Sequence, residues 1–146
     1  MDALTREECQ SIINQDHTWD EVDIVKKSGS HIKFSGADIS LWGEHYPNIF
    51  KEFVLKYEVG DFCTKHIDNK WSFVNPGYHA HLVWITPLNE GYEGGELYVN
   101  DELVEQEVGV PLKYKRTTPH EVTEVTKGTR YSLVSWLFVK DKPRSK

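Results

Sequence analysis

The chain has 146 residues with a net charge of −6, 38% hydrophobic and 27% charged residues, and five Trp, seven Tyr and six Phe. This composition predicts one folded domain over residues 1–146, because disordered chains are poor in aromatic residues, and the acidic balance argues against the broad cationic surface that nucleic acids require. The longest uncharged apolar run, residues 131–139, is too short to cross a bilayer, and two cysteines with no signal peptide favour a cytoplasmic protein without a membrane partner.

The amino-terminal segment has the pattern of a short helix. Residues 4–14 (LTREECQSIIN) place apolar side chains at helical spacing, and Thr5 followed by Glu8 is the pattern of a capping box. We expect this segment to be the only substantial helix of the chain.

Most of the remaining sequence has the alternation of β-strands. Two strands joined by a turn are predicted for residues 19–27 and 31–41, and residues 44–52 predict a short helical turn that interrupts the sheet. Further strand-like runs occur at residues 53–59, 80–88, 96–100, 111–115 and 130–139. Turn-forming residues separate these runs, so the sequence predicts a mainly β sandwich or jelly roll with a core of about residues 53–139. Residues 140–146 (KDKPRSK) have nothing to bury and predict a flexible tail.

The first segment that carries chemistry is H-I-D at residues 66–68. In an extended strand, residues two apart project from the same face, so His66 and Asp68 can reach one point. His120 heads a later β run, and the fold could bring it opposite this pair. Two histidines and one carboxylate form the facial triad that suits non-haem Fe(II) and leave coordination positions open. An H-x-D segment alone is also typical of a polar surface strand, so both interpretations stay open at this point.

A charged residue begins one of the most apolar strands. Arg130 and Ser132 share one face of residues 130–139 and can both address one buried anion. A guanidinium together with a hydroxyl is what a carboxylate requires. In the absence of the histidines and Asp68, an edge-strand arginine paired with a surface aspartate would be the favoured interpretation.

Taken together, the pattern H-x-D…H…R resembles the Fe(II)- and 2-oxoglutarate-dependent dioxygenases, whose fold is a double-stranded β-helix, or jelly roll. The segment YEVGDFCTKHID resembles the Y-x-x-G-x-x-x-x-x-H-x-D stretch of prolyl 4-hydroxylases. TPLNEGYEGGELYV resembles their strand ending in L-N, followed by G-G-x-L, and TPHEVTEVTKGTRYSLVSW resembles their H-E-V and R-Y-x-x-x-x-W. The resemblance covers residues 57–138 and points to the prolyl 4-hydroxylase-like branch.

The resemblance implies a role for each matching residue. His66, Asp68 and His120 would hold iron, and Arg130 would bind the distal carboxylate of 2-oxoglutarate, with Ser132 beside it. Three further positions match residues that line the cosubstrate pocket, although a pocket wall in a jelly roll is also core: Leu97, Val122 and Trp136. Tyr57 matches a tyrosine that helps to bind the cosubstrate.

Two departures from the prolyl 4-hydroxylase pattern concern the same pocket. Cys63 stands where many of these enzymes carry a second tyrosine, and Thr86 and Pro87 replace aromatic residues that often precede L-N. Which residues besides Arg130 complete the cosubstrate site on this side therefore stays open.

The chemistry implied by the resemblance uses Fe(II), 2-oxoglutarate and O₂, with ascorbate as a further candidate. Oxidative decarboxylation would release succinate and CO₂ and hydroxylate an unactivated C–H bond. Asp68 favours hydroxylation over halogenation, because halogenase relatives carry a small residue in place of this carboxylate.

The substrate is less defined by the sequence. The resemblance favours a prolyl residue in a polypeptide, with a free amino acid or small metabolite as the alternative, and residues 69–79 and 89–94 as the mouth of the site. His79 and His81 offer an alternative H-x-H metal pair, although nothing around them matches an anion-binding partner. A non-catalytic, cupin-like metal-binding jelly roll is the alternative from another class, and Arg130 argues against it, because a static metal site needs no buried guanidinium.

Overall fold

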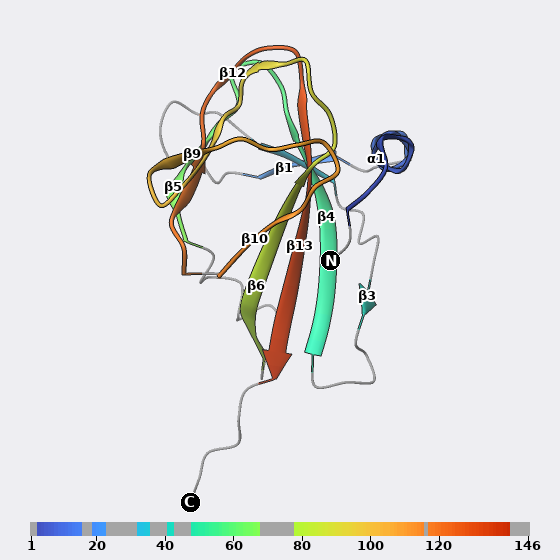
Figure 1. The fold of residues 1–146 in the computed structure, drawn as a ribbon, viewed down its shortest axis with the longest axis vertical. Helices are drawn as coiled ribbons and strands as arrows, with labels where there is room; N and C mark the ends of the chain where they lie inside the picture. Colours follow the sequence, from blue (N-terminus) through green and yellow to red (C-terminus); the bar gives the residue numbers. More distant parts are fainter. Residues whose placement is uncertain are drawn as a thin grey trace, which may run out of the picture.

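The computed structural model describes residues 3–15, 19–22, 32–35, 41–42, 48–67, 78–115 and 117–140 (Figure 1). These residues form one short helix and a set of antiparallel strands. The elements are α1 (Arg6–Ile13), β1 (Trp19–Val22), β2 (Ile32–Ser35), β3 (Leu41–Trp42), β4 (Asn48–Tyr57), β5 (Cys63–His66), β6 (Tyr78–Pro87), β7 (Glu93–Gly94), β8 (Leu97–Val99), β9 (Glu102–Val104), β10 (Leu112–Lys115), β11 (His120–Val122), β12 (Val125–Lys127) and β13 (Arg130–Lys140).

The strands form two main sheets. The larger has the order β1-β2-β4-β13-β6-β10, with β3 also paired to β4, and the smaller has the order β5-β11-β8-β9. From β4 onward the chain passes repeatedly between the two sheets, and β7 and β12 form a separate small ribbon. This topology is a mainly β double-stranded β-helix, or jelly roll, with a short amino-terminal helix, so the predicted fold class is confirmed.

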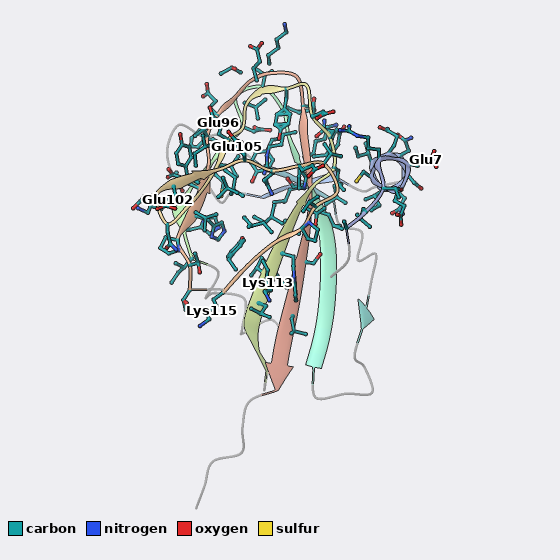
Figure 2. The ribbon with its side chains drawn as sticks, in the orientation of Figure 1. Glu7, Glu96, Glu102, Glu105, Lys113 and Lys115 are labelled. Atoms are coloured by element: carbon teal, nitrogen blue, oxygen red, sulfur yellow. The ribbon has the colours of Figure 1, made fainter. Side chains whose placement is uncertain are left out.

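The main core lies between the two sheets, where Figure 2 shows side chains filling the space. It combines side chains from the larger sheet with side chains from the smaller one: Tyr57, Val83, Ile85, Tyr114, Val134 and Trp136 from the first, Cys63, Leu97 and Val122 from the second, and Val125. A second cluster lies on the other face of the larger sheet, where Cys9 of α1 packs with Val54, Leu88 and Leu133. Strand β13 is thus buried on both faces, which explains its nearly continuous apolar sequence.

The helix forms where the sequence predicts it. Thr5 accepts a hydrogen bond from the backbone N–H of Glu8, and the Glu8 carboxylate accepts one from the N–H of Thr5, so the capping box is present. Cys9 is the buried residue of the helix, and burial raises the pKa of its thiol, which keeps this cysteine unreactive.

Replacing Thr5 with Ala is expected to lower the free energy of unfolding by about 1 kcal/mol, because the backbone N–H of Glu8 loses its acceptor. Denaturant titration measures the change, and Ser11→Ala, an exposed substitution on the same helix, is the matched control. Equal stability of the two variants would show that the cap contributes nothing.

One predicted element is wrong. Residues 44–52 were expected to form a helical turn, yet β4 begins at Asn48 and continues as a strand through residue 52. The physical reason is pairing: β4 lies between β13 and β2, and β3 pairs with it at Lys51 and Phe50. Residues 43–47 lie outside the described residues.

Other sequence expectations match the observed strands with small shifts. The pair predicted for residues 19–27 and 31–41 corresponds to β1 and β2, which pair antiparallel, while the turn between them lies outside the described residues. The short strands β7, β9 and β12 were not predicted. Of the tail at residues 140–146, only residue 140 is described.

The described residues contain no helix with the length and hydrophobicity of a membrane span.

Candidate metal and cosubstrate site

The smaller sheet places two histidines side by side. His66 ends β5 and His120 begins β11, and the antiparallel register sets these residues directly opposite each other. Their ring centroids are 4.3 Å apart, with the planes tilted by 56°. The structure therefore brings together two of the three residues that the sequence suggested as metal ligands.

A backbone carbonyl fixes the tautomer of each ring. His66 Nδ1 donates to the carbonyl of Thr64 at 2.7 Å, and His120 Nδ1 donates to the carbonyl of Thr118 at 2.9 Å. With the proton on Nδ1, the lone pair of each neutral imidazole lies on Nε2. Histidines that bind metals are typically oriented by such a bond from the second ring nitrogen, so this donor set fits a divalent cation.

The third suggested ligand, Asp68, lies outside the described residues, which end in this region at Ile67. Among the described residues, no group of three or more His, Cys, Asp and Glu side chains could hold a metal ion. Cys63 contacts His66, but its Sγ lies 3.4 Å from Nδ1, the nitrogen that donates to Thr64. Cys63 is therefore a packing neighbour of His66.

Arg130 is one of the most deeply buried side chains, with 1% of its surface exposed. Its Nε is buried without a hydrogen-bond partner, and so is Oγ of Ser132 two residues later on the same strand face. Among the described residues, no carboxylate forms an ion pair with Arg130. A buried charge without a counter-ion is costly, so these two orphaned donors fit a ligand carboxylate.

Tyr57 completes this part of the site. It pairs with Arg130 across β4 and β13, and the guanidinium carbon lies 5.0 Å from the centre of the Tyr57 ring. The aromatic face thus supports the buried cation through a cation–π interaction.

The three predicted pocket residues lie in the main core. Leu97, Val122 and Trp136 are buried, and Val122 pairs with Leu97 across β11 and β8. All three side chains belong to the main hydrophobic core between the two sheets. The side chains of His79 and His81, the alternative metal pair, and residues 69–77 of the expected site mouth lie outside the described residues.

Two residues of this region were missed in the sequence. The amide of Gln106 accepts from Arg130 Nη2 at 3.4 Å, and the ring of Tyr114 lies 4.7 Å from that of His120. Alternation within the LKYK run could have placed Tyr114 on the inward face. No periodicity marks Gln106, which lies in the segment between β9 and β10.

The L-N and G-G motifs build the surroundings of Arg130. Asn89 Nδ2 donates to the carbonyl of Thr129 at 2.7 Å, and Asn89 Oδ1 accepts from the N–H of Tyr131 at 2.8 Å. This side chain therefore holds the backbone on both sides of Arg130. Gly95, at φ +60°, lies so close that an added Cβ would be 3.1 Å from Cδ of Arg130.

Replacing Gly95 with Ala is therefore expected to weaken 2-oxoglutarate binding by about tenfold, because the new methyl group crowds the side chains of Val125, Arg130 and Tyr92 and shifts Arg130 with them. Isothermal titration measures this affinity. Gly91→Ala is the matched control, since Gly91 also has a positive φ, +88°, but no neighbour within 4 Å of the added Cβ. If both variants bind 2-oxoglutarate equally, the contact with Arg130 has no influence.

Comparison with known proteins places the chain in a family. Residues 53–138 match the 2OG-Fe(II) oxygenase superfamily. A PKHD-type hydroxylase of Shewanella oneidensis is 31% identical over an alignment of 147 positions, which covers 94% of this chain and 62% of the relative. A PKHD-type hydroxylase of Delftia acidovorans is 37% identical over an alignment of 124 positions, which covers 77% of this chain and 51% of the relative. The chain thus spans about half to three fifths of the length of these curated relatives.

Solved structures share the fold. A viral collagen prolyl hydroxylase from Paramecium bursaria Chlorella virus-1, in its 2OG complex, superposes with a TM-score of 0.63 over 94% of this chain and 92% of its own, at 14% identity. A Pseudomonas putida prolyl-4-hydroxylase gives 0.52 over 64% of this chain and 53% of its own, at 25% identity. A cupin 2 conserved barrel domain protein from Rhodopseudomonas palustris gives 0.55 over 89% of this chain and 77% of its own, at 11% identity, so the fold alone does not separate oxygenases from cupins.

The sequence match separates them, because it covers the strands that carry His66, His120 and Arg130. Recognition of the prolyl 4-hydroxylase-like pattern agrees with the PKHD-type relatives. The chain belongs to the 2OG-Fe(II) oxygenase superfamily.

Proposed function

We propose that the protein is an Fe(II)- and 2-oxoglutarate-dependent hydroxylase in which His66, Asp68 and His120 hold the metal. The two opposed histidines with fixed tautomers support this assignment, and Asp68 follows His66 at the spacing of the facial triad. We further propose that residues 1–146 form one dioxygenase domain.

The observation that carries the proposal is the buried Arg130 with an orphaned Nε, next to the orphaned hydroxyl of Ser132. Arg130 and Ser132 would bind the distal carboxylate of 2-oxoglutarate, with Tyr57 against the guanidinium. In this buried setting a charge-assisted hydrogen bond is stronger than in water. A cupin that only binds a metal would have no use for this costly arrangement.

Each part of the site has a distinct task. Bound Fe(II), together with 2-oxoglutarate and O₂, supplies the oxidative chemistry that yields succinate, CO₂ and a hydroxylated product. Arg130 orients the cosubstrate, and Leu97, Val122 and Trp136 exclude water from the apolar wall beside it.

For the substrate, we propose a prolyl residue in a polypeptide. Support comes from the H-E-V, R-Y-x-x-x-x-W and G-G-x-L segments and from the likeness to PKHD-type hydroxylases and to the Pseudomonas putida prolyl-4-hydroxylase. A free amino acid or a small metabolite is the alternative that the experiment below distinguishes.

Two measurements test the proposal in sequence. Anaerobic addition of Fe(II) and 2-oxoglutarate should give the weak visible charge-transfer band of a chelated 2-oxo acid, and a metal-bound protein without this band would favour the cupin alternative. Aerobic incubation with proline-containing peptides or free proline should then release succinate and add one oxygen atom to the peptide. Turnover coupled only to a free amino acid would refute the polypeptide substrate and leave the oxygenase assignment intact.

A further inference from the structure

The side chain of Gln106 bridges two neighbouring strands of the larger sheet, β6 and β13, and is bound at both ends of its amide. Its Nε2 donates to the backbone carbonyl of Ile85 on β6 at 3.3 Å, and its Oε1 accepts from Nη2 of Arg130 on β13 at 3.4 Å. A carbonyl and a guanidinium can be satisfied together in only one orientation of the amide. The two contacts therefore fix the amide oxygen toward Arg130.

The charge of this contact matters as much as its geometry. Gln106 is neutral, so it occupies one N–H of the guanidinium without compensating the positive charge. A carboxylate in the same place would form a buried ion pair with Arg130 and would compete with any anionic ligand. Among the described residues, no other side chain hydrogen-bonds to Arg130, and its Nε remains buried without a partner.

We propose that Gln106 determines which charge the site accepts at the distal end of the cosubstrate. Gln106 positions Arg130 and leaves its positive charge uncompensated. The site therefore selects a dicarboxylic 2-oxo acid over the same acid with a neutral amide end. This inference rests on the proposed function. Gln106 holds Nη2, which directs the incoming carboxylate to Nε of Arg130 and Oγ of Ser132. Gln106 is a positioning residue, because it acts through Arg130.

The experiment compares two ligands on the full chain loaded with Fe(II) under anaerobic conditions. Isothermal titration gives the dissociation constants of 2-oxoglutarate and of 2-oxoglutaramate, in which an amide replaces the distal carboxylate. Gln106→Glu introduces the carboxylate at nearly constant shape, and Gln106→Met removes both polar contacts at similar volume. The neighbouring Glu105→Gln is the control, since Glu105 is exposed and labelled in Figure 2.

For Gln106→Glu we expect 2-oxoglutarate affinity to fall by about tenfold or more, while 2-oxoglutaramate loses less, so that the preference for the dicarboxylate shrinks. Its melting temperature should equal or exceed that of the native protein, because the new carboxylate pairs with Arg130. Glu105→Gln should preserve both constants. A purely structural role of Gln106 would lower the melting temperature without moving the ratio of the two constants.

An unchanged ratio in Gln106→Glu would overturn the inference while leaving the proposed function standing. If that variant does not fold, Gln106→Met decides: it should bind 2-oxoglutarate several-fold more weakly, and native affinity in this variant would overturn the inference. Failure of the native protein to bind 2-oxoglutarate at all would instead overturn the proposed function.

Discussion

Arg130→Met is expected to weaken 2-oxoglutarate binding by about 2–5 kcal/mol, equivalent to at least about thirtyfold, without destabilising the fold. The loss follows from removal of the guanidinium, whose Nε is buried without a hydrogen-bond partner, as is Oγ of Ser132. The stability follows from the same burial: Arg130 is 1% exposed and has no carboxylate partner among the described residues. Replacing such a buried charge with an apolar side chain of similar length is often neutral or stabilising, by about 1–4 kcal/mol.

Two measurements on the Arg130→Met variant distinguish a ligand-binding role of Arg130 from a structural role. Isothermal titration gives the affinities for Fe(II) and for 2-oxoglutarate, and denaturant titration gives the free energy of unfolding. Arg130→Lys is the matched control, since it keeps the charge but loses the planar fork, and should fall between the native protein and Arg130→Met in 2-oxoglutarate affinity. A variant that unfolds more easily and still binds 2-oxoglutarate normally would make Arg130 a structural residue.

Features of the fold that depend on residues close together in the sequence could be predicted from the sequence alone. The pairing of Thr5 with Glu8 predicts the capping box that the structure contains, and the apolar run at residues 130–139 corresponds to β13. Strand β4 shows where local pattern fails, because residues 48–52 become a strand through pairing with β13 and β3. Short strands such as β7 could not be predicted either, because the strands they pair with are distant in the sequence.

The candidate site divides in a similar way. His66, His120 and Arg130 stand out by residue type in an apolar context, and the resemblance of motifs implies a common role for them. Gln106 could not be found in this way, because its importance depends on the Ile85 carbonyl and the Arg130 guanidinium, which two other strands supply.

The roles of the motif residues around Arg130 also required the structure. Asn89 and Gly95 were noticed only as parts of the L-N and G-G segments. Both residues support Arg130 in the structure. Asn89 hydrogen-bonds to the backbone of the residues before and after Arg130, and Gly95 leaves room for the Arg130 side chain. Residues that lie elsewhere in the sequence therefore help to position Arg130.

Loss of either opposed histidine should have the largest effect on the metal. We expect His66→Ala and His120→Ala each to lower Fe(II) affinity by about a hundredfold or more, because even loss of a residue that only orients a ligand typically costs ten- to a hundredfold. Competition with a chromophoric chelator under anaerobic conditions measures the affinity. The charge-transfer band with 2-oxoglutarate should disappear in both variants at Fe(II) concentrations that saturate the native protein.

Two control variants test whether the loss of Fe(II) affinity is specific to His66 and His120. Glu121→Gln changes the residue next to His120, which alternation places on the other face of β11, and should bind Fe(II) normally. His79→Ala tests the alternative H-x-H pair and should also keep the metal.

Because the rings of His66, His120 and Tyr114 pack together, the melting temperature of each histidine variant must be measured as well. A folded His120→Ala protein with native Fe(II) affinity would remove this histidine from the metal site, and loss of the metal in His79→Ala alone would transfer the site to β6.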